Sequence, residues 1–194
     1  MGSFPRWTSV VACVAVLVGL GGCGNTKETR FYVLTALPAT ERPSDASSGP
    51  NPAIGLRPIG MPEQLDRPQI VTRVGENMLH LAEFDQWGAP LQENFTQVLA
   101  QNLGILVPTD RVVVFPWPTA SPLDYEVAVD VAQFEGSLSG NCSLIAHWAV
   151  LRRGANTPPV TGTSNHREPA GDSYATLVAA LSRDIATALK AAKQ

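Results

Sequence analysis

The chain has 194 residues, and its 14 basic and 17 acidic side chains give a formal net charge of −3 at pH 7. The charges form no block of one sign, so composition argues against a nucleic-acid partner and against a basic surface for anionic lipid headgroups. The length suits a single domain.

The N-terminal segment has the pattern of an export signal. Arg6 is the only charged side chain among residues 1–22, and an uncharged apolar run extends from Val10 to Leu20. A transmembrane helix needs about 20 apolar residues, whereas this run has the shorter length of a signal-peptide h-region. The sequence predicts a lipoprotein signal peptide over residues 1–22.

Cys23 follows Leu20-Gly21-Gly22 directly, an order similar to a bacterial lipobox. A thiol there is a good nucleophile for a diacylglyceryl group, and an additional N-acyl chain such as palmitate supplies the further chain that stable anchoring needs. The alternative is an ordinary secretory signal with a cysteine near the cut. We expect a covalent diacylglyceryl and N-acyl lipid on Cys23, and no other cofactor.

The residues after the cut indicate where the lipoprotein resides. Gly24 stands where an aspartate commonly marks retention in the inner membrane, so the outer membrane is favoured, with the domain on its periplasmic face. Cys13 leaves with the signal peptide and Cys23 carries lipid. Cys142 is then the remaining thiol, and its apolar, strand-like surroundings predict that it is buried and inert.

Residues 23–52 are expected to hold the lipid anchor, a short strand in "RFYVLT" (30–35) and a Pro/Ser-rich linker from Pro38 to Pro52. Residues 53–194 are expected to form the domain. A strand is predicted in "AIGLRPIG" (53–60). "QIVTRV" (69–74) and "NMLHLAEF" (77–84) then flank Gly75-Glu76, a pair suited to a type II′ hairpin turn.

An amphipathic helix is predicted after Trp87, with Pro90 in its first turn and Gly104 at its C-cap. Its apolar residues follow helical spacing: Leu91, Phe95, Val98, Leu99 and Leu103. Further strands are predicted in "RVVVFPW" (111–117), which two prolines end, and in "DYEVAVDVAQFEGS" (124–137), which alternates so that one face is buried.

The central strand pattern "CSLIAHWAVLRR" (142–153) is apolar on both faces. This fits a strand covered on both sides or one that lies in an oligomer, so a homo-oligomer stays open. "PVTGTSNHRE" (159–168) is predicted as the last strand, and residues 172–194 as a second amphipathic helix. The order predicts an α+β fold, with two helices on one face of a mixed, mostly antiparallel sheet.

Catalytic and metal-binding patterns are missing from the sequence. There is no Gly-x-Ser-x-Gly elbow, no C-x-x-C, no H-E-x-x-H and no acidic Ca²⁺ loop. His80 and His147 fall inside strand-like runs, and His166 has no identifiable partner. We expect no catalytic residue, no metal ligand and no enzymatic activity.

The segment Asp66-Arg67-Pro68-Gln69 stands out before the hairpin, as does Trp87 before the helix. A local explanation is that Asp66 and Arg67 fix a turn, that Pro68 blunts a strand edge and that Trp87 staples its loop to the helix. The other explanation is a polar turn beside a strand edge that docks a partner.

These features together resemble the PqiC/YmbA lipoproteins, the ABC-type transport auxiliary lipoprotein components. The resemblance extends from Cys23 through "RFYVLTALP", "LDRPQIVTR" and "AEFDQWGAPLQENFTQVLAQNL" to the C-terminal helix. It implies a domain like the N-terminal domain of TolB, anchored in the outer membrane. It also implies an MCE-domain partner that spans the periplasm and carries lipids between membranes, in support of envelope integrity.

Only Cys23 receives a role from the resemblance; Asp66, Arg67, Pro68 and Gln69 match the family pattern without an assigned chemistry. The second hypothesis is a different envelope-assembly lipoprotein, one that binds peptidoglycan or an outer-membrane protein. A hydrolase ranks third.

Overall fold

The computed structural model describes residues 27–42, 51–107, 109–118, 122–180 and 183. The predicted signal peptide, Cys23 and the middle of the linker lie outside the described residues. No helix within the described ranges is long and apolar enough to cross a membrane.

Three long strands form the antiparallel half of the sheet: β6 (Tyr125–Gly136), β7 (Gly140–Arg152) and β8 (Val160–Gly171). The other edge of β6 is divided between two strands. β2 (Ile54–Leu56) pairs parallel with its start, and β3 (Gln69–Gly75) meets its end through Thr72 and Gly136. A single bridge between Gly60 and Asp130 lies between them.

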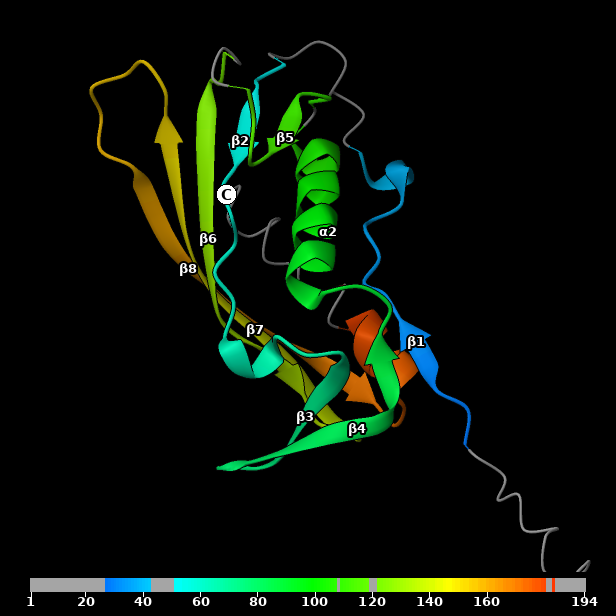
Figure 1. Cartoon of the computed structure of the whole chain (residues 1–194). Coiled ribbons are helices and arrows are strands. Elements are labelled where there is room, and N and C mark those ends of the chain that lie inside the picture. Colours follow the sequence, from blue (N-terminus) through cyan, green and yellow to red (C-terminus); the bar gives the residue numbers. More distant parts are fainter. Residues whose placement is uncertain (1–26, 43–50, 108, 119–121, 181–182, 184–194) are drawn as a thin grey trace, which may run out of the picture.

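The remaining strands complete both ends of the sheet. β4 (Met78–Trp87) forms a hairpin with β3, and β1 (Arg30–Tyr32) pairs parallel with the end of β4. β5 (Val112–Val114) pairs parallel with β2. In Figure 1, β1, β3 and β4 lie at one end of the molecule, and β2 and β5 lie at the other.

The helices contribute to one hydrophobic core. α2 (Leu91–Leu106) lies alongside β5, and residues 174–180 are helical near the C-terminus. Phe95 of α2 packs edge-on against Phe134 of β6, with ring centroids 5.1 Å apart. All five apolar positions predicted for α2 are buried, as are Leu177 and Val178 of the second helix. The expected α+β fold with a mixed, mostly antiparallel sheet is confirmed.

The hairpin turn differs from the prediction. The turn residues are Glu76 and Asn77, because Gly75 still pairs with Met78. Neither Gly75 nor the two turn residues adopts a positive φ, so the primed turn types do not apply here. The register instead shifts between Arg73 and Gly75, and this irregularity accommodates the twist of the strands.

Gly104 is also placed differently: α2 continues to Leu106, and Val107 is its C-cap. Leu106 is buried, which favours the extra turn. Gly104 instead lets the chain at Thr109 pack closely against the helix, because a Cβ at residue 104 would lie 3.2 Å from the carbonyl oxygen of Thr109. Two short 3-10 helices, η1 (Ala39–Glu41) and η3 (Glu63–Leu65), complete the described elements.

The predicted burial of Cys142 is confirmed, and that of one face of β6 is confirmed only in part. Val131 is buried, and after a register shift the next buried apolar side chain is Phe134, three residues later. Val127 and Val129 are only partly buried against the core. Cys142 is completely buried on β7. β7 lies between β6 and β8, which agrees with a central strand, and the oligomer stays a prediction.

The segment after β1 crosses α2 and is held there by two asparagines. Asn94 accepts a hydrogen bond from the backbone N–H of Leu34 at 2.6 Å, and Asn102 accepts one from Leu37 at 2.8 Å. The side chains of the helix thereby satisfy backbone N–H groups that have no neighbouring strand to pair with. Residues 30–37 are thus attached to the same body as α2.

Candidate functional site

The Asp66–Gln69 turn connects η3 to β3 and is fixed by its backbone. The N–H of Asp66 donates to the carbonyl of Glu63 at 3.0 Å, and the carbonyl of Pro68 accepts from the N–H of Trp87 at 2.7 Å. Leu65 and Ile70, on either side of the turn, are buried. The backbone of the turn is therefore held between two core side chains, next to the end of β4.

The side chains of this turn contrast with its backbone. Asp66 and Pro68 are exposed, and Arg67 and Gln69 are half-buried. The carboxylate of Asp66 makes no hydrogen bond or ion pair with the described residues. The Nε of Arg67 is buried, yet it has no hydrogen-bond acceptor among them.

An unsatisfied buried donor costs about 1–3 kcal/mol, and more when the group is charged. Asn102 Nδ2 is the other such atom in the described part of the chain, but Asn102 is fully enclosed in the core. Arg67 as a whole is half-buried, and its other guanidinium nitrogens are not enclosed and have no partner among the described residues. Carboxylate and carbonyl oxygens are the acceptors that such donors bind.

Trp87 is a core residue beside this turn, and its packing onto the helix stays a prediction. It is the last residue of β4 and is buried in the core cluster, and its backbone N–H donates to the carbonyl of Pro68. Pro90 is the N-cap of α2, one residue before the helix begins. The bond from Trp87 fixes the turn in place without using the side chain of Asp66 or Arg67.

A second polar cluster, which no sequence pattern predicted, joins β1 to β4. Asp85 is buried; Arg30 lies 2.7 Å from one of its oxygens, and the hydroxyl of Tyr32 donates to it at 2.8 Å. Burial would raise the pKa of Asp85, but the hydrogen bonds from Arg30 and Tyr32 outweigh it and hold that pKa below 3.8.

The same contacts act on the two donors. Burial, then the bond to Asp85, raises the pKa of the Tyr32 hydroxyl, and the bond to Asp85 raises the pKa of the Arg30 guanidinium. The signal in the sequence was an aspartate in an otherwise strand-like run, opposite an Arg-x-Tyr spacing. The cluster ties the strand nearest Cys23 firmly to the sheet.

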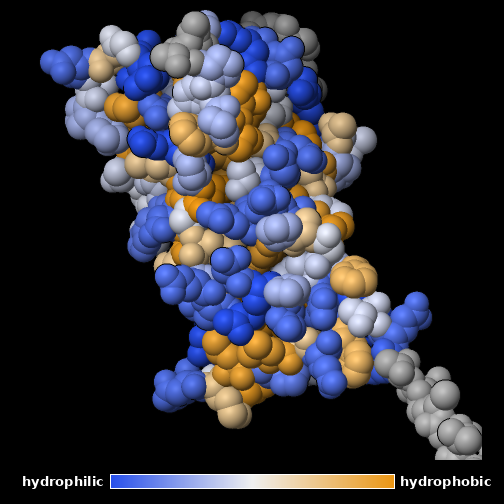
Figure 2. Space-filling model, in the orientation of Figure 1, coloured by the Kyte–Doolittle hydropathy of each residue, from blue (hydrophilic) through white to orange (hydrophobic). Residues whose placement is uncertain are grey.

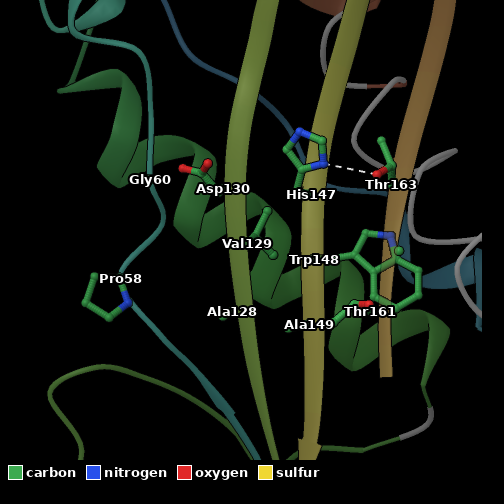
Figure 3. A pocket seen from close by; sticks show the side chains of 11 residues that line it. Pro58, Gly60, Ala128, Val129, Asp130, His147, Trp148, Ala149, Thr161 and Thr163 are labelled. Atoms are coloured by element: carbon green, nitrogen blue, oxygen red, sulfur yellow. Dashed lines mark hydrogen bonds between the residues drawn. The ribbon is translucent and has the colours of Figure 1, made fainter. Parts of the chain in front are cut away.

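A shallow hollow of about 600 Å³ lies on β6, β7 and β8. Figure 3 shows Asp130 beside Gly60 on one side, and His147 bonded to the hydroxyl of Thr163, at 3.0 Å, on the other. Within the described ranges, no hydrogen bond or ion pair joins His147 to a carboxylate. The arrangement lacks the oriented base that nucleophilic catalysis requires.

The remaining histidines do not change this conclusion. His80 is exposed on β4, and His166 is half-buried on β8. No group of three or more His, Cys, Asp or Glu side chains gathers in the described part of the chain.

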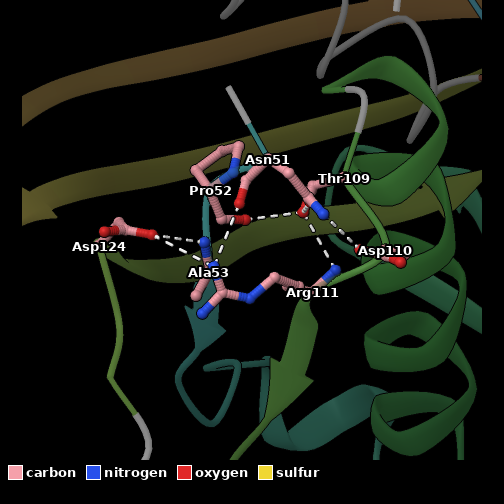
Figure 4. A network of polar contacts seen from close by, with 7 residues as sticks. All are labelled: Asn51, Pro52, Ala53, Thr109, Asp110, Arg111 and Asp124. Atoms are coloured by element: carbon pink, nitrogen blue, oxygen red, sulfur yellow. Dashed lines mark hydrogen bonds and ion pairs between the residues drawn. The ribbon is translucent and has the colours of Figure 1, made fainter. Parts of the chain in front are cut away.

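A third polar cluster surrounds a second Asp-Arg dipeptide, Asp110-Arg111 (Figure 4). The side chain of Asn51 donates to Asp110 at 2.8 Å, and Arg111 donates to the backbone carbonyl of Asn51 at 3.2 Å. The buried hydroxyl of Thr109 lies 2.7 Å from the side-chain oxygen of Asn51 and 2.7 Å from the carbonyl of Pro52. This cluster attaches the end of the linker to the start of β5.

Comparisons with known proteins agree with this fold. An uncharacterized protein of known crystal structure matches with a TM-score of 0.68 and 18% identity, over 86% of this chain and 98% of that chain. A Xanthomonas campestris protein matches with a TM-score of 0.66 and 15% identity, over 81% and 89%. These two likenesses show the fold alone.

A PelC dodecamer from Paraburkholderia phytofirmans is more distant, with a TM-score of 0.44 and 11% identity over 82% of this chain and 94% of that chain. Curated protein sequences give no match. The model of one protein family, the ABC-type transport auxiliary lipoprotein component, matches residues 32–191. The chain therefore belongs to the family of ABC-type transport auxiliary lipoprotein components.

Proposed function

We propose that this lipoprotein docks a periplasm-spanning MCE-domain protein at the outer membrane, as part of an intermembrane lipid transport system that supports envelope integrity. The lipid on Cys23 holds the chain at the membrane. The Asp66–Gln69 turn and the surface around it receive the partner, and the chain catalyses no reaction.

The observation that carries this proposal is the state of Arg67. Its Nε is buried without an acceptor, in a turn whose backbone is fixed by Glu63, Leu65 and Trp87. The other nitrogens of this half-buried guanidinium are not enclosed and have no partner among the described residues. Because the turn that carries them is fixed, a partner's acceptor gains a charge-assisted hydrogen bond there without first ordering the loop. Asp66 beside it carries the opposite charge, so the pair of charges favours one orientation of a bound partner.

The family supports the transport context, because its members are auxiliary components of ABC-type transport. The runner-up is an envelope-assembly lipoprotein that binds peptidoglycan or an outer-membrane protein. Capture of an MCE-domain protein from detergent extracts, identified by mass spectrometry, distinguishes the two.

The test of the docking turn uses the lipidated full-length chain as bait and the MCE-domain protein of the same bacterium as prey. The double change Asp66→Ala and Arg67→Ala should lower capture roughly 30-fold, which corresponds to about 2 kcal/mol at a binding hot spot. The melting temperature should shift by less than about 2 °C.

The control is the double change Asp110→Ala and Arg111→Ala, which removes the same two residue types from the other Asp-Arg dipeptide. It should lower the melting temperature, while the folded fraction still captures the partner. If the Asp66/Arg67 variant unfolds more easily but its folded fraction binds normally, the turn belongs to the fold and the docking role is wrong.

The lipid anchor has its own test. Cys23→Ser should leave an unprocessed precursor that takes up no labelled fatty acid. Normal acylation of that variant would contradict the lipobox assignment without affecting the docking result.

A further inference from the structure

Exposed apolar side chains concentrate at one end of the molecule. Seven large hydrophobic residues are strongly exposed in the described ranges, and five belong to the β1–β4–β3 end: Phe31, Val33, Val74, Met78 and Leu81. Phe31 is 66% exposed and Met78 is 59% exposed. Figure 2 shows hydrophobic surface over the lower end of the molecule, where Figure 1 places β3 and β4.

β1, on one side of this end, is the strand nearest to the proposed lipid anchor, and Met78 lies eight residues along β4 from Gln86, which pairs with Phe31. Lys27 is the fourth residue after Cys23. A chain extends by at most 3.3–3.6 Å per residue, so Lys27 lies within about 14 Å of the lipidated residue. Phe31 follows four residues later, which places β1 close to the membrane surface whenever the anchor is inserted.

Close packing prevents β1 from moving away from the sheet. The contacts of Arg30 and Tyr32 with Asp85 bind β1 to β4. Phe31 and Val33 alternate with Arg30 and Tyr32 along the chain, and their side chains are exposed. Gly88 allows this fit, because a Cβ at residue 88 would lie 3.3 Å from Val33. The apolar side chains are therefore presented by a fixed sheet edge.

The charges of this end do not favour an electrostatic contact. Arg30 is paired with Asp85, and Arg73 with Glu135. Lys27 lies 5.4 Å from the centre of the Phe84 ring. The exposed acidic side chains there outnumber Lys27: Glu28, Glu76 and Glu83. A polybasic attraction to anionic lipids is absent from these described residues, so any membrane contact must come from apolar burial.

We infer that the β1–β4–β3 end of the domain rests on the bilayer that holds the lipid anchor, with the side chains of Phe31 and Met78 in the headgroup region. This inference rests on the proposed acylation of Cys23. The contact orients the domain on the membrane and directs the β2–β5 end away from it.

The test uses the lipidated full-length chain reconstituted into phosphatidylcholine vesicles. A single nitrobenzoxadiazole dye is attached at Phe31→Cys, Met78→Cys or Val160→Cys. Val160 is the matched control, because it is 65% exposed but starts β8, far from β1. The native Cys142 is completely buried, so the parent chain measures background labelling.

Brominated phosphatidylcholine should reduce the emission at residues 31 and 78 roughly two-fold, as expected for side chains 5–10 Å into the interface, and leave residue 160 unchanged. Replacing a third of the lipid with phosphatidylglycerol, or adding salt, should not alter this result. Flotation of the same samples reports anchoring independently.

Chains that float with the vesicles but show no quenching at residue 31 or 78 overturn the inference and leave the anchor intact. A blue-shifted emission that bromine does not quench would mean that protein covers this end, which also overturns it. Chains that do not float contradict the anchor and the inference together.

Discussion

Two Asp-Arg dipeptides, each a short distance before a β-strand, are used differently by the same molecule. Asp110-Arg111 precedes β5, and both side chains bond to the linker residue Asn51. Asp66-Arg67 precedes β3, and neither side chain has a partner in the described part of the chain. The first dipeptide holds the fold together, whereas the side chains of the second make no contact of this kind with the described residues.

The difference arises from the surroundings of each dipeptide. Asn51 is brought to Asp110 by the parallel pairing of β2 with β5, and Asp124 completes the cluster by accepting the N–H of Ala53 at 2.7 Å. At Asp66, the neighbouring contacts are all made by the backbone. A dipeptide therefore does not determine whether its charges stabilise the fold; tertiary neighbours do.

The largest effect should come from the centre of the Asp110 cluster. Thr109→Val keeps the shape of the side chain but removes the hydroxyl, which is buried and also accepts the N–H of Arg111 at 3.0 Å. Leaving these groups unpaired should lower the free energy of unfolding by about 2 kcal/mol, measured by urea unfolding. Thr161→Val, at an exposed position on β8, is the control and should change it little. Equal stabilities of the two variants would contradict the structural role of this cluster.

Arg67→Leu should have a smaller effect on stability, and in the opposite direction. Removing a buried donor that has no acceptor should leave the free energy of unfolding unchanged or raise it by up to about 1 kcal/mol. Arg111→Leu should lower it, because Arg111 bonds to Asn51. Both variants are measured by urea unfolding and by capture of the MCE-domain protein. A marked loss of stability in Arg67→Leu would show that Arg67 belongs to the fold, like Arg111.

Much of the fold was predictable because local patterns agree with tertiary packing. The spacing from Leu91 to Leu103 predicted α2, and the alternation after Tyr125 predicted β6. The predictions at Gly75 and Gly104 were wrong because each assigned a glycine to a turn or cap. Gly75 instead remains in a paired strand, and Gly104 makes a close approach to Thr109.

The functional features were less accessible from the sequence. The Asp66–Gln69 segment could be selected by its motif, but the unsatisfied Nε of Arg67 depends on what packs around it. The Asp85 cluster depends on a pairing between residues 30–32 and 85–87, which no local pattern specifies. The division of β6's edge between β2 and β3 is likewise a long-range property.

The smallest expected effect is a difference in pH dependence between the two aspartates. The bond from Asn51 holds the pKa of Asp110 below its ordinary 3.8 in the folded chain. The Asp110 carboxylate therefore binds a proton more readily in the unfolded chain than in the folded chain. The contribution of Asp110 to stability is complete above pH 3.8 and is lost as the pH falls toward the lowered pKa. Asp85 contributes with the same sign, so the parent chain should lose stability on acidification.

Asp110→Asn should remove only part of this dependence. Between about pH 6 and pH 3, its urea midpoint should fall less steeply than that of the parent chain. Asp66→Asn is the matched control, because its carboxylate makes no bond with the described residues; its midpoint should follow that of the parent. If Asp66→Asn flattened the profile as much as Asp110→Asn, Asp66 would have a partner within the fold. The contrast between the two dipeptides would then be lost.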